Sequence, residues 1–123
     1  MKQLFLLLTA LLTVEAANAA PLTLTATIKE VAVIARPGVD YGGVQISVVE
    51  PITGTGCTAA DLASGFYYSS FTSTAVMPLI QLIHAQAIAA KAQDLKIKVF
   101  YDSASTCYPG YGVGFTGISI PYP

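Results

Sequence analysis

The chain has 123 residues and a formal net charge of −1, and 54% of its residues are hydrophobic. This length suits one domain with a modest core, while so weak a charge argues against a nucleic-acid partner or an anionic membrane surface, both of which require a basic face. Two cysteines and a single histidine do not complete a tetrahedral metal site, so no metal is expected.

The first twenty residues have the features of an export signal. Lys2 precedes an apolar stretch over residues 4–14, and Ala17-Asn18-Ala19 forms an A-x-A cleavage site. The stretch is too short to span a membrane, and no later segment is long and uncharged enough to do so. A membrane anchor is the alternative interpretation. We expect residues 1–19 to be a signal peptide, and residues 20–123 to form one secreted or periplasmic domain that is not inserted in a membrane.

Residues 22–35, LTLTATIKEVAVIA, predict a long first strand. They alternate and are rich in β-branched side chains, and the alternation changes phase near Lys29 and Glu30, where a bulge is expected. The following segments are a turn over residues 36–43, a returning strand over 44–50, a loop over 52–64 and a short aromatic strand over 65–69.

The segment from Thr74 to Gln93 lacks glycine and has a 3.6-residue apolar period, which predicts a helix beginning near Pro78. Its apolar face is formed by Leu79, Ile80, Ile83, Ala87 and Ala90, and Gln81, His84 and Lys91 lie on another face.

Residues 95–101 alternate cleanly and predict the fourth strand, with Leu95, Ile97, Val99 and Tyr101 on one side and two lysines on the other. A polar loop over residues 102–109 and a last strand over 113–120 complete the chain. The order β-β-β-α-β-β predicts a mainly β fold with one helix, namely an OB-like five-stranded antiparallel barrel. The alternative is another α+β sandwich with one helix on one sheet face.

Cys57 and Cys107 are expected to form one disulfide, because an exported chain folds in an oxidising compartment. Closing a loop of about 50 residues stabilises the fold by roughly 4 kcal/mol in the chain-entropy model.

Residues 112–117, GVGFTG, match the G-x-G-x-x-G pattern of dinucleotide-binding sites. That pattern requires a following helix, and the few residues after it do not provide one. No cofactor is therefore expected. Gly110, Gly112 and Gly114 are spaced by two, so a strand would place them on one face and allow the chain to bend or another backbone to pack closely.

The chain is not expected to be an enzyme. Its single histidine, His84, lies in the predicted helix, and the acidic residues are scattered singly. A small exported enzyme would require His84 to lie in a cleft beside an acid or a serine.

Tyrosines are concentrated at strand ends and in loops, notably Tyr108-Pro109-Gly110-Tyr111 beside Cys107 and Tyr41 in the first turn. A tyrosine offers a flat apolar face with a hydroxyl, which suits stacking against a sugar ring or a protein surface. The alternative interpretation is that many of these rings belong to the core.

The passage from the alanine-rich helix through AKAQDLKIKVFYD to a cysteine-bearing loop and a last strand resembles the receptor-binding B subunits of subtilase-cytotoxin and pertussis-toxin type. It also resembles related small exported bacterial proteins of unknown role. The resemblance covers about residues 65–120. It implies an OB-fold, a pentameric ring and binding of sialylated or other glycans. It also implies a sugar contact at Tyr101, next to Asp102, with Thr23 and Thr25 as candidates for a sugar loop.

We therefore expect an exported, non-catalytic binding module, with a glycan or a protein receptor as its partner and homo-oligomers by resemblance. The candidate ligand-binding residues are Tyr101, Asp102, Tyr108, Tyr111 and Tyr41. The alternative is an envelope or secreted protein that binds or inhibits another protein.

Overall fold

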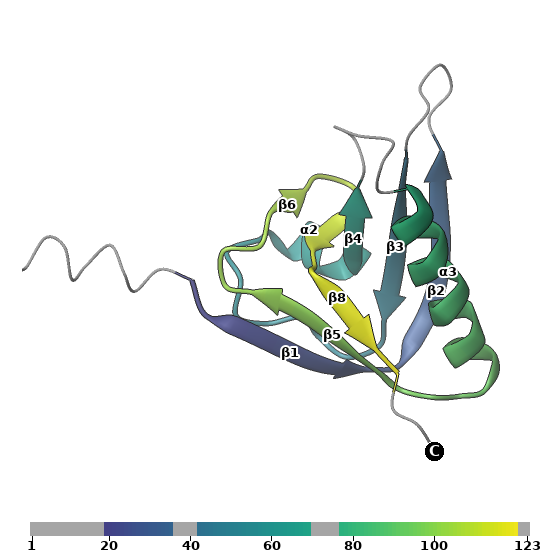
Figure 1. Cartoon of the computed structure of the whole chain (residues 1–123). Coiled ribbons are helices and arrows are strands. Elements are labelled where there is room, and N and C mark those ends of the chain that lie inside the picture. Colours follow the sequence, from purple (N-terminus) through teal and green to yellow (C-terminus); the bar gives the residue numbers. More distant parts are fainter. Residues whose placement is uncertain (1–18, 36–41, 70–76, 121–123) are drawn as a thin grey trace, which may run out of the picture.

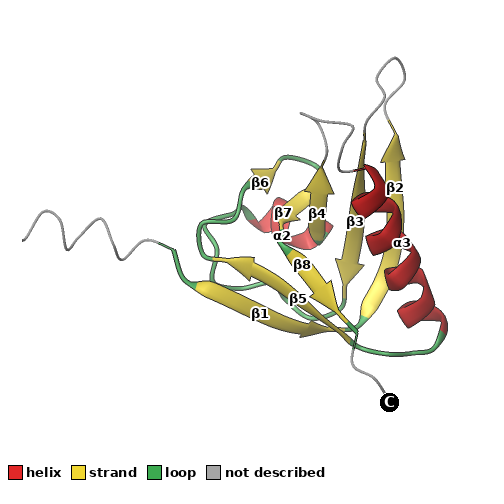
Figure 2. Cartoon of the chain, viewed as in Figure 1, coloured by secondary structure: helices red, strands yellow, loops and turns green. Residues whose placement is uncertain are grey.

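The computed structural model describes residues 19–35, 42–69 and 77–120, and every structural statement below concerns these residues. Its elements are β1 (Pro21–Ala26), β2 (Ile28–Ala35), β3 (Gly42–Val48), α2 (Ala59–Ser64), β4 (Phe66–Ser69), α3 (Met77–Ala92), β5 (Ile97–Asp102), β6 (Cys107–Tyr108), β7 (Gly112–Gly114) and β8 (Gly117–Ser119). The described part of the chain is mainly β, and α3 packs beside β2 and β3 (Figures 1 and 2).

The strands form a three-stranded sheet in the order β1-β5-β8 and a five-stranded sheet in the order β2-β3-β4-β7-β6. Neighbouring strands are antiparallel, except that β4 and β7 run parallel. The expected mainly β, α+β fold with a long helix between the third and fourth predicted strands is confirmed. The first and last predicted strands each divide between two sheets, so the described residues form more than the five strands expected. The prediction that all strands are antiparallel is wrong, because β4 and β7 run parallel.

The first predicted strand divides at Thr27, so that β1 pairs with β5 and β2 pairs with β3. The register of β2 with β3 shifts between Ile28 and Glu30, which confirms the predicted bulge. A bulge adds bend and twist to a strand, and here it lies directly after the point where the chain passes from one sheet to the other.

Glu50 holds this junction. Its Oε2 accepts a hydrogen bond from the backbone N–H of Thr27 at 2.6 Å, and its Oε1 accepts one from the Thr27 hydroxyl at 2.7 Å. Burial alone would raise the pKa of Glu50, but the bonds from Thr27, helped by the charge of Lys96, hold that pKa below its ordinary value.

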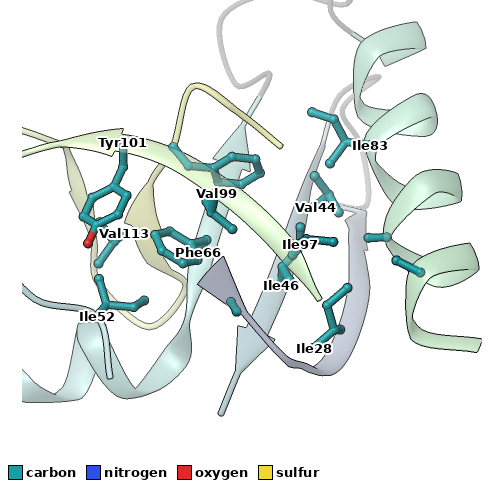
Figure 3. Close-up of a cluster of buried hydrophobic side chains, with 14 of the residues drawn as sticks. Ile28, Val44, Ile46, Ile52, Phe66, Ile83, Ile97, Val99, Tyr101 and Val113 are labelled. Atoms are coloured by element: carbon teal, nitrogen blue, oxygen red, sulfur yellow. The ribbon is translucent and has the colours of Figure 1, made fainter. Parts of the chain in front are cut away.

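The core lies between the sheets and is closed on one side by α3. Figure 3 shows Val44 and Ile46 of β3 among Ile97 and Val99 of β5, with Ile83 approaching from α3. The predicted alternation is confirmed from Ile97 to Tyr101, although β5 begins two residues later than expected. Burial of these β-branched side chains removes apolar area from water and thereby stabilises the fold.

Helix α3 begins one residue before the expected Pro78 and runs to Ala92. Four residues of its predicted apolar face are buried, namely Ile80, Ile83, Ala87 and Ala90. Leu79 is the exception, because it lies at the margin of this stripe and is 43% exposed.

The segment 52–64 differs from the predicted loop, because it contains the short helix α2. Thr58 caps this helix, since its Oγ1 accepts a hydrogen bond from the backbone N–H of Asp61 at 3.3 Å. The predicted disulfide between Cys57 and Cys107 is confirmed, with the two Cα atoms 5.5 Å apart. It ties the segment in front of α2 to β6.

The glycines of GVGFTG allow a close approach between two backbones. Gly112 has a φ of 134°, and a Cβ there would collide with the carbonyl oxygen of Gly65. The neighbouring N–H of Val113 donates to that same oxygen at 2.8 Å. The predicted close backbone packing is therefore confirmed at Gly112, and β8 rather than a helix follows the motif.

Candidate functional site

An open hollow of about 220 Å³ lies where the end of β5, strand β6 and the link between β7 and β8 meet. We call it the β5–β6 hollow. It is lined by Asp102, Ala104, Ser105, Thr106, Tyr108, Gly114, Phe115 and Thr116. The disulfided Cys107 lies between two of these residues, so the hollow is built on a part of the chain that is covalently tied to the segment before α2.

A tight turn after β5 forms one wall of the hollow. Asp102 Oδ1 accepts a hydrogen bond from the N–H of Ala104 at 2.8 Å, and the N–H of Ser105 donates to the Asp102 carbonyl at 3.1 Å. The backbone N–H of Asp102 in turn donates to Ser105 Oγ at 3.0 Å. An aspartate at the first position of a turn commonly forms such bonds. The carboxylate and the serine hydroxyl are thereby fixed at the wall.

Tyr108 forms the aromatic side of the hollow and is itself held by a second tyrosine. Its half-buried ring packs edge-on against Tyr67, with centroids 5.2 Å apart. Tyr67 is fully buried and also stacks on Tyr111 at 4.9 Å. Aromatic pairs at these distances favour a fixed geometry. Tyr108 is therefore a preorganised surface, which reduces the entropy lost when a ligand binds.

Gly114 and Thr116 also line the hollow. A Cβ at Gly114 would lie 3.3 Å from Tyr108 Cε2 and 3.2 Å from the Thr106 carbonyl oxygen, so the glycine leaves room beside the ring. Thr116 donates its hydroxyl to the Phe100 carbonyl at 3.1 Å, which leaves the oxygen lone pairs as acceptors. The hollow thus combines one aromatic face with several hydroxyls and one carboxylate.

The structure brings only some of the predicted site residues together. Asp102 and Tyr108 both line the hollow. Tyr111 is half-buried against Tyr67, and its carbonyl accepts a hydrogen bond from Gln45 Nε2 at 2.6 Å. Tyr41 lies outside the described residues.

Tyr101 has the position of a core residue. It is 5% exposed, its ring packs on Phe66 with centroids 5.2 Å apart, and its hydroxyl donates to the Thr53 carbonyl at 3.0 Å. Figure 3 shows the ring alongside Phe66 and Val113, with the hydroxyl pointing toward the segment that carries Ile52. The ring and its hydroxyl are used inside the protein, so Tyr101 offers little surface for the direct sugar contact that the resemblance implies.

Thr23 and Thr25, the candidates for a sugar loop, are exposed on strand β1 and pair with Phe100 and Lys98 of β5.

Sequence reasoning missed Ser105, Thr106 and Thr116, although the first two precede a disulfide cysteine in a polar loop. His84 is half-buried in α3, which lies across the molecule from β6 in Figure 1.

Three aliphatic side chains on α3 face solvent. Leu79, Leu82 and Ile88 are 43%, 53% and 45% exposed. The described length of this helix carries only one lysine and one histidine among its ionisable groups. The exposed side of α3 is therefore largely apolar and carries little charge.

Within residues 19–35, 42–69 and 77–120, no helix is long and apolar enough to cross a membrane, and no group of three or more His, Cys, Asp or Glu side chains is placed to hold a metal ion. The chain matches no protein-family model, and no curated protein is significantly similar to it.

Proposed function

We propose that the chain is an exported, non-catalytic module that binds carbohydrate in the β5–β6 hollow. One observation carries this proposal, namely the pairing of the held ring of Tyr108 with the hydroxyls of Ser105 and Thr116 in one open hollow. A pyranose ring has an apolar face of C–H groups and a rim of hydroxyls, so it suits an aromatic surface edged by hydrogen-bonding side chains.

The strand pairings support an OB-like fold as part of this proposal. Strands β1 and β2 can be counted as one bent strand, and β7 and β8 as a second one. The pairings then lead from the first bent strand through β3 and β4 to the second, and from there through β5 back to the first. Helix α3 then lies between the third and fourth of five strands, as in a partly open Greek-key barrel. Oligosaccharide-binding OB-folds use the loop between strands four and five, which is the part of this chain that builds the hollow.

Export is supported by two independent features. The N-terminal residues have the n-region, apolar stretch and A-x-A site of a signal peptide. The disulfide between Cys57 and Cys107 requires an oxidising compartment to persist. Together they favour a secreted or periplasmic location.

A saccharide panel tests the proposal, with tyrosine fluorescence and calorimetry as readouts because the chain has no tryptophan. We expect at least one saccharide to bind, and Tyr108→Ala to weaken it at least about fivefold, taking as a guide the roughly 1–3 kcal/mol that a nucleobase gains by stacking on an aromatic side chain. Phe100→Ala is the matched control, because this ring is 39% exposed on β5 and does not line the hollow. Equal loss in both variants, or no binding by the native protein, would contradict the proposal.

A second candidate function is binding of another protein, either a receptor or a further copy of this chain as the B-subunit resemblance implies. The exposed Leu79, Leu82 and Ile88 on α3 favour it, since apolar side chains gathered on one element often mark an interface. A solution mass of one chain, together with saccharide binding, would count against it. A mass of several chains that falls to one in Leu82→Glu, without saccharide binding, would favour it.

A further inference from the structure

The lining of the β5–β6 hollow carries one charged side chain. Asp102 is the only acidic side chain in its lining, and no lysine or arginine among the described residues lines it. Lys98 is exposed on the same face of β5 as Asp102. The two residues lie four positions apart along the strand, which corresponds to a backbone separation of about 13 Å. In water, even without salt, a charge at that separation acts about three times more weakly than one at 4 Å, so Lys98 offsets only a small part of this charge.

The turn after β5 holds the Asp102 carboxylate in place. Oδ1 accepts the N–H of Ala104 at 2.8 Å, which fixes the side chain at the wall of the hollow. An ionised carboxylate is an acceptor only, so it favours a ligand group that donates a hydrogen bond, such as a sugar hydroxyl. A carboxylate on the ligand would instead meet a like charge, and no cationic side chain lines the hollow to offset it.

We infer that the hollow selects uncharged saccharides over sialylated ones, with Asp102 as the residue that determines this specificity. The inference rests on the proposed carbohydrate binding and names the class of ligand for the same site. A like charge about 4 Å away in a site open to water corresponds to about fivefold weaker binding, and to more where the site excludes water. The effect should weaken as salt is added.

The test uses pairs of oligosaccharides that differ only by a terminal sialic acid, titrated into the native protein at low salt. We expect the sialylated member of each pair to bind at least about fivefold more weakly. Asp102→Asn should reduce this ratio toward one, because its amide oxygen still accepts from Ala104 while the charge is removed. Asp102→Glu, which keeps the charge, should retain the discrimination.

Asp94→Asn is the matched control, since it removes one negative charge from an exposed residue in the turn before β5. It should leave the ratio unchanged, and thermal unfolding of each variant verifies that it is folded. Equal or tighter binding of the sialylated sugars by the native protein would overturn the inference and leave carbohydrate binding standing. A ratio that persists in Asp102→Asn would overturn the role of Asp102. A protein that binds neither member of any pair would contradict the proposed function and this inference with it.

Discussion

Glu50 joins distant parts of the chain through a single carboxylate. Both of its oxygens accept hydrogen bonds from Thr27, and the N–H of Val49 donates to the Thr27 carbonyl at 3.0 Å. Thr27 is the residue at which the chain passes from the three-stranded to the five-stranded sheet. A side chain that satisfies backbone groups at such a bend stabilises the bend itself.

This arrangement predicts a pH dependence of the free energy of unfolding. Because folding lowers the pKa of Glu50, its contribution is fully present above the unfolded value of 4.5 and is lost as the pH falls through the lower folded value. Glu50→Gln should lower the free energy of unfolding by about 1–2 kcal/mol at neutral pH, since the amide has only one acceptor oxygen. It should also flatten the loss of stability below about pH 5.

Urea unfolding of the native protein and Glu50→Gln across this pH range measures both effects. Glu30→Gln is the control, because Glu30 is exposed on β2 close to the same junction. A Glu50→Gln profile parallel to the native one would refute the role assigned to this carboxylate.

Tyr101 shows how much of the structure the alternation of side chains in a strand can predict. The alternation of residues 95–101 places Tyr101 on the same face as Ile97 and Val99, and that face is buried. The resemblance to toxin B subunits instead suggested an exposed contact. The shared face predicted from the strand pattern agrees with the burial of Tyr101, and the sugar contact implied by the resemblance stays a prediction.

At the scale of elements, β7 depends on two glycines that have different roles. Gly110 and Gly112 both have positive φ, but a Cβ at Gly110 meets open space, whereas one at Gly112 meets the backbone of Gly65. Comparing alanine at the two positions therefore separates the cost of the backbone conformation from the cost of close packing.

We expect Gly110→Ala to cost about 1–2 kcal/mol, the usual penalty for a left-handed residue with a side chain. Gly112→Ala should cost at least about 2 kcal/mol more, because β7 must move away from β4 to make room. Chemical denaturation measures both losses. Similar values for the two variants would mean that β4 and β7 separate easily.

The elements that sequence reasoning missed depend on contacts between distant residues. The division of the first strand at Thr27 coincides with hydrogen bonds to Glu50, which lies 23 residues away. The parallel pairing of β4 with β7 requires the glycines at 65 and 112. Helix α2 is different, because Thr58 three residues before Asp61 is a local capping signal that the sequence contained. The disulfide and the long helix were predictable because composition and period alone specify them.

At the scale of the whole molecule, the candidate site and the exposed apolar side of α3 lie apart. The hollow is formed beside β6, and α3 lies at the other side of the fold next to β2 and β3 (Figure 1). The disulfide fixes the part of the chain that builds the hollow, which limits the number of conformations that it adopts. This separation allows the two candidate functions to be distinguished in one experiment.

Nuclear magnetic resonance of the isotope-labelled protein, titrated with an uncharged saccharide selected from the panel, is the most direct measurement of carbohydrate binding in the β5–β6 hollow. Binding there should shift the backbone amide signals of residues 102–108 and 114–116 and leave the signals of α3 unchanged. Shifts confined to α3, or no shift with any saccharide, would contradict the proposed site.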